Sequence, residues 1–137
     1  MAVIPARAFR YDIVLRQGMD EYFPMRIEDP HGTMADLDGW TATLALYRAP
    51  ATLASLHDEP PVSAPGATVT LGTFDGGDPA TGGFGLYNVL PAFPSATTSA
   101  LSPWGNGIYN IDISDSFGHV QYRIEGTIVL VEGTRHE

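Results

Sequence analysis

The sequence contains no cysteine and no lysine. Without cysteine, the chain forms no disulfide, offers no thiolate to a metal and uses no cysteine nucleophile. Its basic residues are seven arginines, set against 16 acidic residues, so the formal net charge is −9. A chain this acidic lacks the basic surface that neutralises phosphates. We therefore expect neither nucleic acid nor an anionic membrane as a partner.

Charged residues of both signs are scarce, at 17% of the chain, while hydrophobic residues make up 44%. A surface covered by threonine, serine, glycine, proline and alanine suits packing against neighbouring molecules. The exclusive use of arginine fits an interface as well, because arginine is enriched and lysine depleted there. A GC-rich coding sequence explains the same bias without any interface, so both explanations stay open.

Long apolar runs are also lacking, and we expect neither a signal peptide nor a membrane span. The length of 137 residues suits one domain. We expect a single β-sandwich domain over residues 1–137, with flexible ends at about 1–8 and 133–137.

Apolar and polar residues alternate along most of the chain, which is typical of half-buried strands. About seven such segments, separated by turn residues, predict an antiparallel sandwich or small barrel. Gly126, in the middle of the last segment, predicts a bulge or a close backbone approach. The predicted strands cover residues 9–16, 21–28, 40–48, 67–74, 84–90, 108–114 and 119–132. The residues predicted to face the core are Ile13, Leu15, Met25, Ile27, Trp40, Leu44, Leu46, Ile111, Ile113, Ile124 and Ile128.

Three segments break this alternation. Residues 49–66 contain four prolines and read as a connection, with a short helical turn possible at 52–56. Residues 75–83 are glycine-rich, which favours a mobile hairpin tip. Residues 94–101 predict a short helix that Ser95 caps and that buries Leu101. We expect 49–66 and 75–83 to become ordered mainly at contacts between chains.

The order of these segments resembles the Ig-like modules of tailed-phage structural proteins, and is similar to the N-terminal domain of phage baseplate upper proteins. The resemblance rests on motifs spread over nearly the whole chain, namely residues 11–18 (YDIVLRQG), 29–32 (DPHG), 37–40 (LDGW), 90–101, 107–112 (GIYNID), 115–118 (DSFG) and 125–129 (EGTIV). It implies an all-β, Ig-like antiparallel β-sandwich with one short helical turn. It also implies a role in attachment to a tail or baseplate scaffold.

Candidate contact residues are aromatic or acidic side chains predicted in loops or on polar faces, because clustered exposed aromatic residues mark contact sites. They are Tyr47, Asp75, Asp78, Phe93, Trp104 and Phe117. The pairs Asp36/Asp38 and Asp75/Asp78 lack the further ligands of a calcium loop, and the four histidines show no metal-ligand spacing. We expect no metal, no cofactor and no catalytic residue.

The sequence therefore predicts a bacteriophage virion structural protein of the tail, neck or baseplate rather than an enzyme. Such a protein is made in the host cytoplasm, forms homo-oligomers and contacts other virion structural proteins. The alternative is a stand-alone carbohydrate-binding or adhesin-like sandwich. In that alternative, Trp104, Tyr47 or Phe117 would stack on sugar rings.

Overall fold

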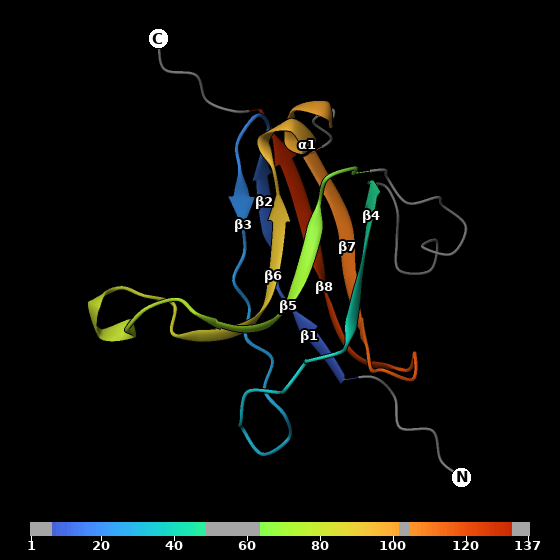
Figure 1. Ribbon diagram of the computed structural model, residues 1–137. Helices are drawn as coiled ribbons and strands as arrows, with labels where there is room; N and C mark the ends of the chain where they lie inside the picture. The colour runs from blue at the N-terminus through green and yellow to red at the C-terminus, as the bar shows by residue number, and fades with distance from the viewer. Residues whose placement is uncertain (1–6, 49–63, 102–104, 133–137) are drawn as a thin grey trace.

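Two β-sheets packed against each other form the body of the protein (Figure 1). The computed structural model describes residues 7–48, 64–101 and 105–132. Within these ranges the strands are β1 (Arg7–Arg10), β2 (Ile13–Arg16), β3 (Glu21–Tyr22), β4 (Thr41–Arg48), β5 (Thr68–Asp75), β6 (Leu86–Phe93), β7 (Gly105–Ser114) and β8 (Val120–Val131). The helices are the 3-10 turn η2 (Pro79–Thr81) and α1 (Ser95–Ala100). The predicted all-β sandwich with short helical turns is confirmed.

The larger sheet has the strand order β1-β8-β7-β4, and β2 pairs with the same side of β8 as β1. Strands β7, β8 and β4 pair antiparallel, as predicted. Strands β1 and β2 run parallel to β8, so this sheet is mixed. A parallel pair needs a long connection, and here almost the whole chain lies between the two partners. Arg7 and Ala8, predicted to belong to a flexible end, pair in β1.

The predicted strand over residues 9–16 is interrupted at Tyr11 and Asp12. At the break an Asp12 carboxylate oxygen accepts a hydrogen bond from the Thr127 backbone nitrogen at 2.9 Å. This bond lowers the pKa of the Asp12 carboxyl below its ordinary value. The buried hydroxyl of Tyr109 donates a hydrogen bond to the Tyr11 carbonyl, and burial raises the pKa of this phenol. Hydrogen bonds therefore fix the backbone conformation at this interruption.

Gly126 allows the backbone of residues 11 and 12 to cross closely over β8. A Cβ atom at this position would lie 2.3 Å from the Tyr11 carbonyl oxygen and 2.8 Å from an Asp12 carboxylate oxygen. Only glycine leaves room for the backbone of residues 11 and 12 to pass so closely over β8. The predicted close approach at Gly126 is confirmed.

The smaller sheet has the order β3-β6-β5. The strand predicted over residues 21–28 is regular only at Glu21 and Tyr22, because Pro24 has no backbone N–H to donate. Its alternation still holds, since Met25 and Ile27 are buried and Arg26 is exposed.

The buried side chain of Asn88 secures the irregular segment after Pro24. Its Oδ1 accepts a hydrogen bond from the Ile27 nitrogen at 2.8 Å. Its Nδ2 donates to the carbonyls of Ile27 and Ala35, both at 2.9 Å. Backbone pairing with β6 continues as far as the bridge between Met25 and Val89, and the Asn88 amide holds Ile27 and Ala35 beyond that bridge.

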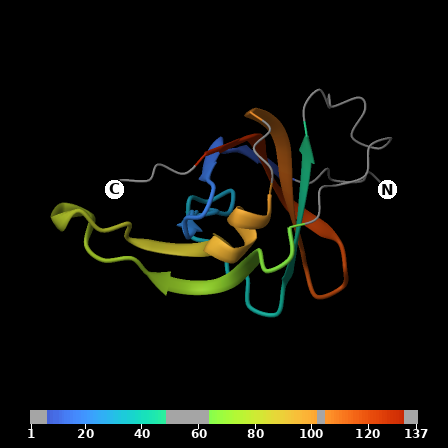
Figure 2. The ribbon, with the colours of Figure 1, turned by 90° about the horizontal axis from the view of Figure 1, so that it is seen from above.

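Helix α1 covers one end of the space between the sheets (Figure 2). Its Thr98 hydroxyl donates to the Met19 carbonyl at 2.8 Å. The helix does not begin with the predicted Ser95 cap, since Pro94 is the N-cap and Asp20 accepts a hydrogen bond from the Ser95 nitrogen. Leu101 is buried at its end, as predicted.

The core lies between the sheets, and nine of the 11 residues predicted to face it are buried. Trp40 and Leu44 are half-buried and pack against its edge. Tyr109, Phe93 and Val89 are also fully buried. The predicted turn at 52–56 and the terminal residues 1–6 and 133–137 lie outside the described residues.

The two leucines on β4 give a direct test of this packing. Leu46→Ala should lower the free energy of unfolding by about 2–5 kcal/mol, because Leu46 is buried and the truncation leaves a cavity. Leu44→Ala, at a half-buried position on the same strand, should cost about half of that or less. Urea unfolding of both variants measures the difference. Equal losses would contradict the placement of the core.

Candidate functional site: a protruding arm and a hollow

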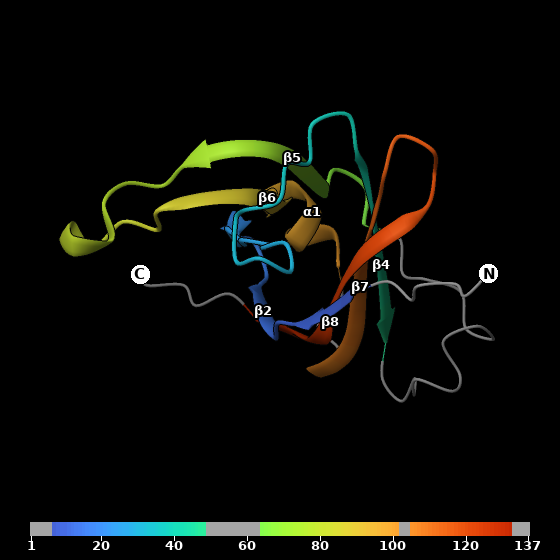
Figure 3. The same ribbon diagram turned by 90° about the horizontal axis from the view of Figure 1, so that it is seen from below.

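The hairpin of β5 and β6 extends beyond the sandwich as an arm, here defined as residues 74–87 (Figures 1 and 3). The pairing register shifts between Leu71 and Phe74, and such a bulge bends a strand. At the root of the arm, the rings of Phe74 and Tyr87 stack with centroids 5.1 Å apart. The arm therefore leaves the body at a bend that an aromatic pair stabilises.

Backbone hydrogen bonds close the tip of the arm. The Gly76 nitrogen donates to the Gly85 carbonyl at 2.7 Å, and the Gly85 nitrogen donates to the Gly77 carbonyl at 2.8 Å. A Cβ atom on Gly83 would lie 2.4 Å from the carbonyl carbon of Gly77. The glycines thus permit a close backbone approach, and the segment forms the hairpin tip that the sequence predicts.

The arm presents apolar and acidic side chains together. Phe84 is 72% exposed and Leu86 is 46% exposed. Asp75 and Asp78 are exposed on the same segment, and residues 74–87 contain no basic residue. A large exposed aromatic side chain on a protruding, ordered hairpin is typical of a protein contact.

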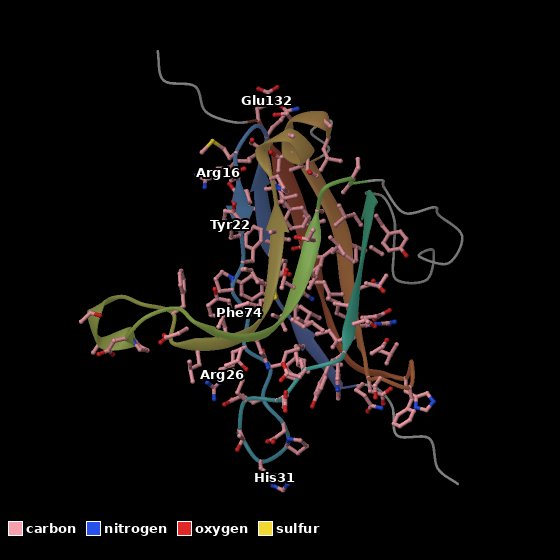
Figure 4. All side chains as sticks on the ribbon, in the orientation of Figure 1. Arg16, Tyr22, Arg26, His31, Phe74 and Glu132 are labelled. Carbon is pink, nitrogen blue, oxygen red and sulfur yellow. The ribbon has the colours of Figure 1, made fainter. Side chains whose placement is uncertain are left out.

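A hollow of about 290 Å³ opens between β1 and residues 24–27. Phe9, Pro24, Met25 and Ile27 line it with apolar surface, and Arg10 and Arg26 line it with positive charge. Arg26 also lines a second hollow, together with arm residues that include Asp75, Asp78 and Phe84 of the same chain. Figure 4 labels Arg26 below Phe74. The hollow and the arm are therefore neighbours on one side of the molecule.

Among the described residues, Arg10 and Arg26 each form an exposed ion pair. Arg10 lies 3.4 Å from Asp12, and Arg26 lies 3.2 Å from Glu28. The Arg10 side chain is 71% exposed. Exposed pairs of this kind contribute little to stability, so both guanidinium groups can take another carboxylate partner.

The structure separates the predicted contact residues. Asp75 and Asp78 lie on the arm, and Phe117 is 83% exposed in the turn between β7 and β8. Tyr47 is half-buried on β4. Phe93 was predicted to be a contact residue, and this is wrong, because the strand alternation of β6 turns its ring fully into the core. Trp104 lies outside the described residues.

The aromatic residues considered for sugar stacking are not brought together within the described part of the chain. Tyr47 pairs with Ile108 at one end of the larger sheet. Phe117 follows Ser114, which pairs with Thr41 at the other end. Tyr47 and Thr41 are six residues apart along β4, which corresponds to about 20 Å at the rise per residue of a β-strand. Tyr47 and Phe117 therefore do not share one stacking surface.

The acidic turns have a structural role. Carboxylate oxygens of Asp36, Asp75 and Asp78 each accept a hydrogen bond from the backbone nitrogen two residues further along. This is the usual reason for aspartate in turns. Among the described residues no group of three or more histidine, aspartate or glutamate side chains is placed to hold a metal ion. None of the helices described is long and apolar enough to cross a membrane.

Compared with known proteins, the chain matches no family model, and it matches no curated protein at a significant level.

Sequence reasoning missed Phe84, Arg10 and Arg26. It placed Phe84 inside a strand, although the flanking Gly83 and Gly85 were a signal for a hairpin tip. No local sequence pattern predicts that Arg10 and Arg26 lie close together, because a hollow between segments distant in sequence arises only from the tertiary fold.

A substitution at Gly83 tests the closed conformation of the tip. Gly83→Ala should open the tip, because the added methyl group collides with the Gly77 backbone. Chymotrypsin should then cleave after Phe84 at least about tenfold faster, while the thermal midpoint changes by less than about 4 °C. The exposed change Ala80→Ser on the same tip is the control. Unchanged cleavage after Phe84 in Gly83→Ala would contradict the closed tip.

Proposed function

We propose that this chain is a structural protein of a tailed-phage virion, located in the tail, neck or baseplate and acting through protein–protein contacts. It is made in the host cytoplasm and has no catalytic role. The observation that carries the proposal is the ordered arm with its exposed Phe84. The order of turn motifs, which resembles the Ig-like modules of phage structural proteins, supports the choice of particle.

An arm of this form suits assembly better than catalysis or small-molecule binding. It presents an exposed aromatic side chain on a protruding hairpin, and such side chains are common anchors of protein–protein contacts. Its tip is closed by its own hydrogen bonds, so little conformational entropy is lost when a partner covers it.

The proposal predicts that removing the tip of the arm blocks incorporation into particles and spares the fold. Asp75 and Leu86 pair across the hairpin, so an Asn-Gly turn in place of residues 76–85 closes the strands directly. The variant should keep the circular dichroism spectrum and the melting behaviour of the wild type. Mass spectrometry of purified particles should find the wild-type chain and not the variant.

Tyr22→Ser is the matched control, because Tyr22 is an aromatic residue that is 58% exposed and lies on β3, outside the arm. This variant should enter particles as the wild type does. Absence of the wild-type chain from purified particles would contradict the proposal. Binding of the monomeric chain to glycans, lost in Phe117→Ser, would instead favour the carbohydrate-binding alternative.

A further inference from the structure

Both sides of a chain-to-chain contact are present on this one molecule. The arm carries Phe84 between Asp78 and Leu86, and the hollow combines apolar walls with Arg10 and Arg26. We infer that the arm of one copy binds in the hollow of a second copy, with Phe84 inserted and Asp75 and Asp78 facing the two arginines. This inference rests on the proposed function and names the partner of the arm.

The dimensions agree with insertion of an aromatic ring. A cavity of about 150 Å³ with apolar walls holds a benzene ring. The hollow has about 290 Å³ and is open to solvent on one side, so the Phe84 ring fits together with part of its backbone. Buried apolar surface at Met25 and Ile27 forms its floor.

Charge favours this pairing over a random contact between two copies. Each copy carries a formal net charge of −9, so two copies repel each other at most relative orientations. Arg16 pairs with the buried Glu21, and Arg123 pairs with Asp112 at 2.6 Å, whereas both partners are exposed in the ion pairs of Arg10 and Arg26. The guanidinium groups of Arg10 and Arg26, which line the hollow, can therefore exchange carboxylate partners more readily. The acidic arm meets favourable charge there.

The arm does not fill the hollow of its own chain, since its tip points away from the body in every view (Figures 1–3). Because Arg26 lines the hollow and also borders the arm of its own chain, the arm and the hollow are adjacent, and a two-fold arrangement lets two copies exchange arms. Both contacts then form at once in a closed dimer, the commonest symmetry among soluble oligomers.

Sedimentation of the full chain over micromolar to millimolar concentrations tests the inference. The wild type should form a species of twice the 14.7 kDa chain mass. Phe84→Ser should raise the dissociation constant by about 30-fold, the usual effect of losing an aromatic anchor. Arg10→Glu should weaken the dimer as well. The controls Tyr22→Ser and Ser116→Glu, at exposed positions outside the arm and the hollow, should dimerise as the wild type does.

A mixture of Phe84→Ser and Arg10→Glu decides whether the arm and the hollow meet. Each variant alone lacks both contacts, whereas the mixed dimer regains one intact arm in one intact hollow. The mixture should therefore associate more tightly than either variant alone. A wild-type chain that stays monomeric, or a mixture no tighter than its components, would overturn the inference.

The experiments distinguish a failure of arm exchange from a failure of the proposed virion role. A monomeric chain that is nevertheless found in particles would refute arm exchange and leave the virion role standing. A chain that dimerises through Phe84 but is absent from particles would refute the virion role and leave arm exchange standing.

Discussion

The side chain of Asn88 fixes the geometry on which the arm and the hollow both depend. It is fully buried, and its amide makes three hydrogen bonds, one from the Ile27 nitrogen and two to the carbonyls of Ile27 and Ala35. An unsatisfied buried polar group costs about 1–3 kcal/mol, so the buried Asn88 amide keeps these three hydrogen bonds. Asn88 follows Tyr87 at the root of the arm, while Ile27 lines the hollow. One side chain thereby sets the position of the arm relative to the hollow.

The other wall of the hollow depends on the crossing at Gly126. Strand β1 stays parallel to β8 up to Arg10, and the backbone then passes over Gly126 at a distance that no side chain would allow. The hydrogen bonds of Asp12 and Tyr109 hold the crossing in place. Because Phe9 and Arg10 precede it directly, they face residues 24–27 in a fixed position. The hollow is therefore formed before any partner arrives, which lowers the entropic cost of binding.

The local pattern of the sequence predicted the rows of core residues, because alternation depends only on which side of a strand faces the other sheet. It also predicted the close approach at Gly126. The parallel pairing of β1 and β2 with β8 has no local signature, since it joins the two ends of the chain. The placement of Phe93 was wrong for a related reason. The predicted strand ended at residue 90, whereas β6 continues to Phe93 and buries it.

The contact surface was predictable only in part. Its acidic residues were identified in the glycine-rich segment, but that segment was expected to gain order from a partner. In the structure Gly76, Gly77, Gly83 and Gly85 allow the two sides of the tip to approach, and the order comes from their backbone hydrogen bonds. The hollow was not predictable from the sequence, because Arg10 lies on β1 and Arg26 lies in the irregular segment after β3, and no sequence spacing relates them.

Hydrogen exchange of the wild-type chain, measured at a dilute and at a concentrated condition, tests the central claim most directly. If the arm of one copy occupies the hollow of another, concentration should slow exchange in peptides covering residues 74–87, 9–12 and 24–28. Peptides covering the exposed turn at 115–118 should exchange at the same rate in both conditions. Slowed exchange at that turn with no change in the arm, or no change anywhere, would contradict the account.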